Sequence, residues 1–263
     1  MASLQHRWGP QVSGLGGACQ SFWDGLKNMF KQPILPLQSG MGALLASPVV
    51  ALLLSQLGWC GILVLDASFQ AFIILAAGGL TVYAVMLSGW SSNSAYGFLG
   101  CWRTLALMLS YELCLGSALL GLGVMNCDTA KSFNFASLSV THQAAAWPLG
   151  ALFLIAAVAE CKRLPFDLPE AEAELVAGFH VELSSLHFVL FFIAEYASMA
   201  VMSALASVFF FGGLQVITLT ALICALILTR GCLPRYRYDQ FMRLGWKAFL
   251  PLSLAFFSFY ASV

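Results

Sequence analysis

The sequence from Glu160 to Glu195 reads E-C-K-R-L-P-F-D-L-P-E-A-E-A-E-L-V-A-G-F-H-V-E-L-S-S-L-H-F-V-L-F-F-I-A-E. It contains seven of the chain's twelve acidic residues, and long runs of Leu, Ala, Phe and Val flank it on both sides. Charge at this density between apolar segments is costly unless it is solvated, paired or functional. The stretch therefore predicts a polar site attached to apolar segments.

The composition of the whole chain predicts a membrane protein. Its 263 residues are 60% hydrophobic and 9% charged, whereas a soluble domain is about half apolar and about a quarter charged. The formal net charge is zero, so no nucleic-acid footprint is indicated. Eight cysteines lie mostly inside apolar runs, without C-x-x-C pairs or metal-ligand spacing. We interpret them as small core residues and expect no metal site.

Seven apolar runs are long enough to cross about 30 Å of hydrocarbon. They lie at about 40–58, 67–87, 104–125, 146–161, 186–210, 213–230 and 247–262. Residues 1–39 form no span, but Phe22, Trp23 and Phe30 recur at the spacing of an amphipathic interfacial helix. We expect an all-α, polytopic transmembrane helix bundle in one membrane domain. Its parts are an interfacial segment (1–39) and a seven-span bundle (40–263) with an acidic loop (162–185) and a basic loop (231–246).

The positive charges test this span assignment. Seven spans place the N-terminal segment, the acidic loop and the basic loop on one side, and every Lys and Arg except Lys131 falls on that side. Such a bias is typical of the cytoplasmic or matrix face. The N-terminus has neither an apolar signal core nor an Arg- and Ser-rich pattern, so no cleavable targeting peptide is expected.

The acidic loop admits two interpretations. Pro165 and Pro169 prevent a continuous helix, and a new helix is expected to begin at the second proline. Glu170 and Glu172 would then complement the dipole of its first turn, which is an ordinary structural role. Glu170 and Glu174, however, share a face and repel each other, so either one holds a proton near neutral pH or arginines match both.

Four further acids lie at or inside the predicted spans. Glu112 is within the third, Glu160 closes the fourth, Glu182 precedes the fifth and Glu195 is inside it. Carboxylates in such positions indicate a proton relay or ion binding, and the alternative is burial in neutral form with one hydrogen bond. Several of them converging on one acidic loop favour a proton-accessible polar path.

The basic loop has its own pattern, L-P-R-Y-R-Y-D-Q-F-M-R-L-G-W-K at residues 233–247. Arg235 and Arg237 would share one face, which suits a flat polar headgroup, an acidic partner surface or lipid phosphates. The alternative is a snorkelling basic border to the last span. The four histidines fit no nucleophile or metal pattern, and no G-x-G-x-x-G or phosphate loop occurs, so the chain is expected to hold no redox cofactor itself.

These segments resemble the quinone-site membrane subunit of respiratory complex I (the NADH:ubiquinone oxidoreductase subunit 1 family). That family's pattern is close to A-E-T-N-R-x-P-F-D-L-x-E-x-E-x-E-L-V-x-G-[FY]-N-x-E-Y, and this chain reads A-E-C-K-R-L-P-F-D-L-P-E-A-E-A-E-L-V-A-G-F-H-V-E-L. Further matches are L-Q-H-R-W-G-P-Q at 4–11, S-G-W-S-S-N-S-A-Y at 88–96, L-S-Y-E at 109–112 and the basic segment at 233–247. The resemblance covers almost the whole chain.

The resemblance implies a place in a proton-pumping enzyme, at the base of the quinone tunnel and the start of an acidic path. The quinone route would be lined by Arg7, Asp24, Phe179, Arg235 and Arg237. The acidic loop would contain Arg163, Asp167, Glu170, Glu172 and Glu174, and the proton path would continue through Glu112, Glu160, Glu182 and Glu195.

The resemblance also implies cofactors, partners and a location. Ubiquinone would be the substrate, and FMN and iron–sulfur clusters would be held by partner subunits. The expected partners are the subunits of the soluble arm at the quinone site, neighbouring small membrane subunits and lipids. The expected location is the mitochondrial inner membrane rather than a bacterial plasma membrane.

The chain departs from the family pattern at several positions. The family's usual first span of eight has no counterpart here, so we expect it to be lost or supplied by a separate polypeptide. Thr-Asn is replaced by Cys161-Lys162, Asn by His180 and Tyr by Leu183. Two other functions fit the carboxylates. One is the membrane subunit of an energy-converting hydrogenase, against which the basic segment argues, and the other is a stand-alone proton or ion channel.

Purification in mild detergent separates these functions. We expect the chain to co-purify in a large assembly with iron–sulfur partners and quinone reductase activity, because the chain lacks a redox centre of its own. Native gel electrophoresis and iron analysis measure this. A small homo-oligomer without iron would contradict the complex I assignment and favour the channel.

Overall fold

The computed structural model describes residues 6–11, 13–34, 36–63, 70–125, 147–167, 178–211 and 213–262. All regular structure within these ranges is helical, which confirms the all-α class. Four helices are long and apolar enough to cross a bilayer. They are α2 (Met41–Leu63), α3 (Gln70–Ser91), α4 (Ala95–Met125) and α7 (Ser185–Phe211).

The other three predicted spans also contain helices. Helix α5 (Trp147–Glu160) and helix α8 (Val216–Cys232) are shorter apolar helices, about 21 and about 26 Å long at 1.5 Å per residue. The last span is part of an unbroken helical run made of α9 (Tyr238–Leu244), a π-helical segment η7 (Gly245–Phe249) and α10 (Leu250–Ser262). The helices are thus confirmed, whereas full membrane crossing by these three remains a prediction.

The basic loop is much shorter than predicted. Helix α8 extends to Cys232 and α9 begins at Tyr238, so only residues 233–237 connect them. The prediction of a loop over 231–246 is wrong because its second half is amphipathic. Phe241 is fully buried in the bundle, whereas Arg243 on the same helix is exposed. The polar residues of this segment therefore lie on the exposed face of a helix and do not form a loop.

The π-helical segment has a local cause in the sequence. Pro251 has no amide hydrogen, and its ring presses on the carbonyl four residues earlier, at Lys247. A wider π turn just before the proline relieves both problems. Gly245 begins this segment, and a Cβ there would lie only 3.3 Å from the ring of Tyr111 on α4. The helix therefore approaches α4 closely at that point.

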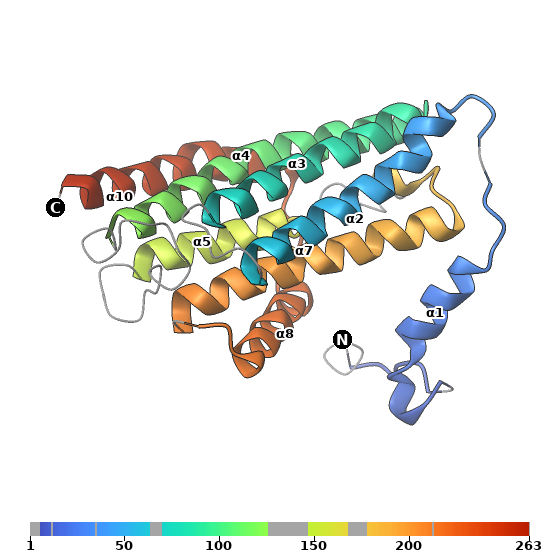
Figure 1. Ribbon diagram of the computed structural model, residues 1–263, viewed down its shortest axis with the longest axis horizontal. Coiled ribbons are helices and arrows are strands. Elements are labelled where there is room, and N and C mark those ends of the chain that lie inside the picture. The colour runs from blue at the N-terminus through green and yellow to red at the C-terminus, as the bar shows by residue number, and fades with distance from the viewer. Residues whose placement is uncertain are drawn as a thin grey trace.

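The long helices form one bundle of nearly parallel rods (Figure 1). Helix α2 packs against α3 and α7, and α4 packs against α3, α5 and α10. The amide of Gly40 donates to the carbonyl of Ser91 at 2.9 Å, so α2 begins where α3 ends. Ser184 Oγ bonds both the amide and the carbonyl of Ile34 (2.8 and 2.9 Å), which brings the start of α7 to the same end.

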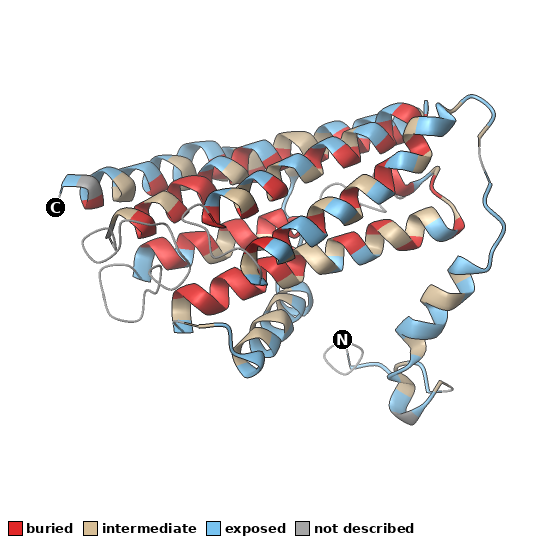
Figure 2. Ribbon diagram, viewed as in Figure 1, coloured by how far each residue is buried: buried red, intermediate tan, exposed pale blue. Residues whose placement is uncertain are grey.

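Burial is concentrated where the bundle helices face one another (Figure 2). Helices α5 and α7 carry many of the buried side chains, including Phe153 and Phe209, whose rings meet edge-on at 4.8 Å. Helix α8 crosses the bundle at an angle beside α7 and has no buried residue. The buried interior of the bundle therefore lies among the other helices.

The N-terminal segment contains the amphipathic helix that its residue spacing predicts. Helix α1 (Gln20–Met29) contacts α7 but has no buried residue. Phe22 and Trp23 are 65% and 56% exposed. Exposed aromatic side chains on a short amphipathic helix are typical of a helix at a membrane interface or against a partner, and that placement remains a prediction.

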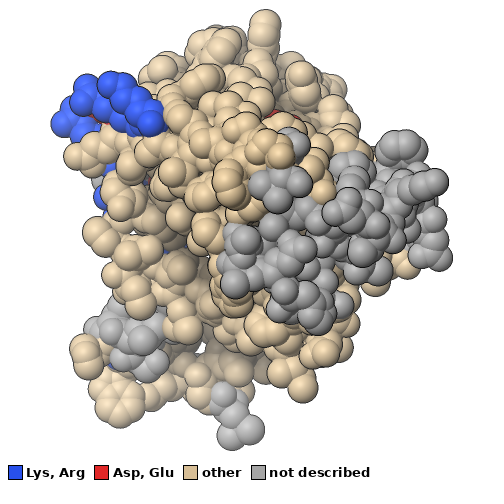
Figure 3. Space-filling view, turned by 90° about the vertical axis from the view of Figure 1, so that its left-hand side faces the viewer, with Lys and Arg blue, Asp and Glu red and all other residues tan. Residues whose placement is uncertain are grey.

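Figure 3 views the molecule from the end where α4 and α10 finish. The described surface there is largely uncharged, and basic side chains gather at one edge. The positive-inside arrangement of the whole chain remains a prediction. Lys131 lies outside the described residues.

An aromatic cluster joins three parts of the chain that are far apart in sequence. The Phe241 ring of α9 stacks on Tyr111 of α4 at 4.5 Å and lies 4.4 Å from Phe166, in the turn after α5. All three side chains are at most 6% exposed. Tyr111 also donates a hydrogen bond to the carbonyl of Phe241 at 3.4 Å. The cluster therefore fixes both charged loops against α4.

Replacing Phe241 tests this cluster. We expect Phe241→Ala to remove about 3–5 kcal/mol of local packing free energy, because a large, fully buried ring is lost. A lower midpoint of heat inactivation of the purified assembly would measure the effect. Phe259→Ala is the matched control, since that ring is 60% exposed and its loss should change the midpoint little. Equal midpoints for the two variants would contradict the packing assignment.

Candidate functional site

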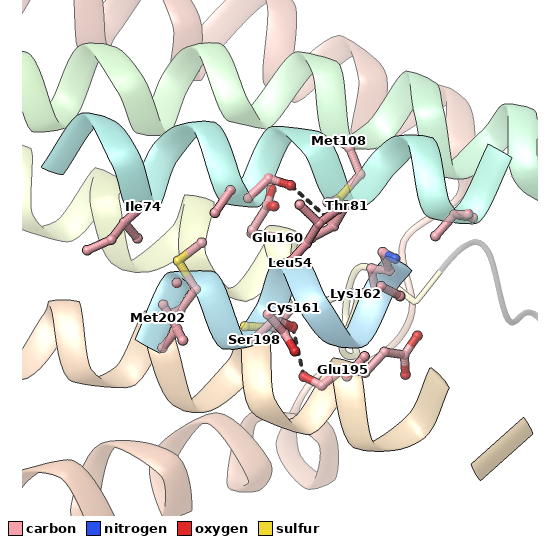
Figure 4. A pocket seen from close by; sticks show the side chains of 18 of the residues that line it. Leu54, Ile74, Thr81, Met108, Glu160, Cys161, Lys162, Glu195, Ser198 and Met202 are labelled. Carbon is pink, nitrogen blue, oxygen red and sulfur yellow. Dashed lines mark hydrogen bonds between the residues drawn. The ribbon is translucent and has the colours of Figure 1, made fainter. Parts of the chain in front are cut away.

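A cavity of about 50 Å³ lies between α2, α3 and α7, at the end of α5 (Figure 4). Its wall is mostly apolar, with the hydroxyl groups of Ser55, Thr81 and Ser198, but Glu160, Lys162 and Glu195 also line it. A cavity of this size has room for about three water molecules. In Figure 4, Lys162 and Glu195 lie toward one end of the cavity and Glu160 lies farther along it.

Glu160 is the last residue of α5 and is 8% exposed. Its Oε2 atom is buried and has no hydrogen-bond partner among the described residues. An ionised carboxylate in that position is costly, so it must be neutralised by a proton or matched by nearby cations and water. The position therefore suits a group whose charge changes.

Two adjacent glycines on α3 bring a second carboxylate close to the first. A Cβ on Gly78 would lie 3.6 Å from Glu160 Oε1, and a Cβ on Gly79 would overlap the carboxyl group of Glu112. Helix α3 thus lacks side chains where Glu160 from α5 and Glu112 from α4 approach its backbone. Glu112 and Glu160, which the sequence assigns to one path, therefore approach the same pair of glycines. Their common function remains a prediction.

Glu195 on α7 lies between two basic side chains. Its Oε2 is 4.0 Å from Arg163 Nη2, and its Oε1 is 3.8 Å from His180 Nε2. The Arg163 guanidinium also lies over the Tyr196 ring, 4.6 Å from its centroid. Arginine is always charged at neutral pH, so it provides a permanent positive charge beside this carboxylate.

The turn after α5 places three successive side chains at the site. Lys162 adopts a left-handed backbone conformation (φ 50°), which reverses the chain and leaves the lysine side chain 9% exposed. Its Nζ lies 5.6 Å from the centroid of Phe179. Cys161 lines the cavity beside it and is 4% exposed.

The acidic and basic loops are joined just beyond this turn. The amide of Tyr236 donates to the carbonyl of Pro165 at 3.2 Å, and Tyr236 stacks on Phe166 at 6.0 Å. Arg235 Nη2 lies 3.4 Å from Asp167 Oδ2. The sequence left open whether arginines match Glu170 and Glu174, and these two acids lie outside the described residues. The structure shows an arginine beside a different acid of the loop, Asp167.

The residues predicted for the quinone route occupy several places. Phe179 is 1% exposed in the short helix η6 (Gly178–His180), and Arg235 pairs with Asp167. Arg237 is exposed and pairs with Asp239 at 3.3 Å. Arg7 and Asp24 lie on the exposed N-terminal segment, where Asp24 accepts a hydrogen bond from Gln20. The described contacts do not unite these five residues, so their common role remains a prediction.

The predicted proton-path residues are located in part. Glu112, Glu160 and Glu195 lie at the cavity or at the glycine pair beside it, whereas Glu182 is half-buried after η6 and does not line the cavity. Glu170, Glu172 and Glu174 lie outside the described residues.

The sequence does not single out two basic residues of this site. Lys162 and His180 stand out in it only as departures from a family pattern, yet Lys162 lines the cavity and His180 lies beside Glu195. The signal that could have found Lys162 is its place two residues after Glu160, at the end of an apolar helix. For His180 the signal is its position where the acidic stretch returns to the membrane.

Comparisons with known proteins agree with this architecture. The family model described as NADH dehydrogenase matches residues 1–261. The chain is 60% identical to NADH-ubiquinone oxidoreductase chain 1 of Chlamydomonas reinhardtii, over 100% of this chain and 90% of that protein. It is 41% identical to the chain 1 protein of Chondrus crispus (97% and 86% covered) and 39% identical to an NADH-quinone oxidoreductase subunit from Rickettsia conorii (95% and 82%). The chain belongs to the NADH dehydrogenase family.

Alkylation of the cysteines tests whether the turn after α5 is closed to solvent. At pH 8, we expect Cys161 to react with a maleimide far more slowly than an exposed thiol, because its side chain is only 4% exposed and the reagent must reach the sulfur. Exposed Cys19 is the internal control. Peptide mass spectrometry after timed labelling measures both rates. Comparable rates at the two cysteines would contradict the closed turn.

Proposed function

We propose that this member of the NADH dehydrogenase family is a core membrane subunit of a proton-pumping NADH:quinone oxidoreductase. In this proposal the chain forms part of the quinone-binding chamber and the beginning of the proton path. The observation that carries the proposal is the row of carboxylates Glu195, Glu160 and Glu112, joined by one cavity and the glycine pair of α3. Family membership supplies the reaction to which such a row would be coupled.

The row has the chemistry that a proton path needs. Each carboxylate can hold or release one proton, and the small cavity between Glu195 and Glu160 is large enough for bridging water. Apolar walls exclude bulk solvent, so a proton that enters would move between these groups rather than leak away. Helices α2 and α3 contribute only uncharged residues to the lining, which leaves the carboxylates and their cations to set the charge of the site.

Quinone reduction would act on this row through charge. A unit charge that appears about 8 Å from a carboxylate changes its energy by about 2 kcal/mol at an effective dielectric constant of about 20. That change is enough to move a proton onto a carboxylate whose two forms are nearly balanced. The docking of Asp167 on Arg235 and of Tyr236 on Pro165 would transmit a rearrangement of the basic segment directly to the turn that carries Lys162 and Arg163.

The substrate would be ubiquinone, as the names of the Chlamydomonas and Chondrus relatives indicate for those proteins. Arg7, Asp24, Phe179, Arg235 and Arg237 would line or gate its route, and Glu170, Glu172 and Glu174 would form the acidic surface beside it. FMN and iron–sulfur clusters would be held by partner subunits of a soluble arm. Arg237, which is exposed on the segment before α9, would meet such an arm.

The proposed location is the mitochondrial inner membrane, with several passes. The apolar helices require a bilayer, and two of the similar proteins that carry the ubiquinone name come from eukaryotic algae. The lysines and arginines would then face the matrix.

Neutralising the two cavity carboxylates tests the proton path. We expect Glu160→Gln and Glu195→Gln each to lower quinone-dependent NADH oxidation and proton pumping by about tenfold or more, because an amide cannot carry the proton. Native gels should show the assembly at normal abundance. Turnover is measured in membrane vesicles with a short-chain ubiquinone, and pumping by the quenching of a pH-sensitive dye. Normal turnover and pumping in both variants would contradict the path.

A further inference from the structure

Two basic side chains accompany the carboxylate row. Lys162 lines the same cavity as Glu160 and Glu195 and is 9% exposed. His180 is 4% exposed, and its Nε2 lies 3.8 Å from Glu195 Oε1. Both can gain and lose a proton, unlike Arg163, which stays charged. The proposed proton path through carboxylates does not itself need a lysine or a histidine, so these two residues need a separate explanation.

The surroundings of His180 make its side chain a sensitive site. Its ring packs against Phe179, Phe188, Phe191 and Phe192, with centroids 3.9, 5.6, 5.6 and 5.4 Å away. The adjacent carboxylate favours the charged form of a histidine in this aromatic pocket. Protonation of His180 and ionisation of Glu195 are therefore linked.

Lys162 is held near both cavity carboxylates without a close pairing to either. Among the described residues, no carboxylate oxygen lies within 4.0 Å of its Nζ, although Glu160 and Glu195 line the same small cavity. A buried ammonium is costly unless it is matched. Lysine, unlike arginine, can give its proton to a neighbouring base.

Among the described residues, the charges around the cavity leave room for one variable proton. From α5 and the turn after it come Glu160, Lys162 and Arg163, from η6 comes His180 and from α7 comes Glu195. Ionised Glu160 and Glu195 balance charged Lys162 and Arg163. A proton on His180, or its loss from Lys162, then changes the total by one. Glu112 on α4, beyond the glycine pair, is the next group along the row.

We propose that His180 and Lys162 are proton-carrying residues of this path: His180 delivers protons to Glu195, and Lys162 passes them across the cavity to Glu160. His180 releases the proton on Nε2, and Glu195 Oε1 receives it. Charged Lys162 gives its proton to Glu160 through cavity water and is recharged by the proton that Glu195 received. Glu195 and Lys162 thus return to their starting states, His180 has lost one proton and Glu160 has gained it. The inference rests on the proposed function and adds two residues to it.

The test separates charge from proton exchange at Lys162. Lys162→Arg keeps the positive charge but cannot release a proton, whereas Lys162→Met keeps neither. We expect both variants to lower proton pumping and coupled turnover in membrane vesicles by about tenfold. Lys247→Met is the control, because that lysine is exposed and its loss should leave pumping unchanged. Normal pumping by Lys162→Arg would overturn the relay role, since charge alone would then suffice.

The pH profile tests His180. An ordinary histidine titrates near pH 6.5, so His180→Asn should flatten the dependence of pumping on pH between about 6 and 7.5, in addition to lowering it several-fold. An unchanged profile with unchanged pumping would overturn the role of His180. Should a variant assemble poorly on native gels, Lys162→Gln and His180→Gln provide smaller changes at the same positions, with the same expected losses.

Parallel measurement of Glu195→Gln and Glu160→Gln distinguishes the two proposals. If these variants lose pumping while the Lys162 and His180 variants keep it, the cationic relay is wrong and the carboxylate path stands. If all of them pump normally, the proposed function itself fails. Loss in all of them, with Lys162→Arg as impaired as Lys162→Met, supports both.

Discussion

The cost of placing carboxylates among apolar helices governs this structure. Glu160 and Glu195 are nearly excluded from water, and an ionised carboxylate in that environment is stable only beside cations, hydrogen-bond donors or trapped water. The fold meets this requirement with the turn after α5, which brings Lys162 to the cavity and Arg163 beside Glu195, and with His180 from η6, which also lies beside Glu195.

A second feature keeps this arrangement in register. The aromatic cluster of Tyr111, Phe166 and Phe241 holds the turn after α5 against α4 and α9. The backbone bond from Tyr236 to Pro165 and the Arg235–Asp167 pair then attach the basic segment to the same turn. Movement at the surface segment 233–237 is thereby linked to the residues that set the charge of the cavity. Such a link is what coupling between a quinone site and a proton path requires.

The glycine pair on α3 shows how a backbone can shape an electrostatic site. Gly78 and Gly79 leave space for Glu160 and Glu112, which come from different helices. Any side chain at Gly79 would occupy the position of the Glu112 carboxyl group. The distance between the two acids is thus set by the absence of side chains on a third helix, and no local pattern around either acid reveals this.

The sequence by itself determined the helical class, the helices of all seven apolar runs and the concentration of acids in one stretch, because hydrophobicity and charge are local properties of the chain. It also predicts that Glu112, Glu160 and Glu195 belong to one path, from their positions relative to the spans. Only the tertiary structure decided that Glu160, Glu195 and Lys162 face the cavity, that Glu182 does not, and that His180 lies beside Glu195. It also showed that residues 238–246 are helical, where the polar residues predict a loop. The physical reason is that the energy of a buried charge depends on neighbours from other helices, which are distant in the sequence and are brought together only by packing.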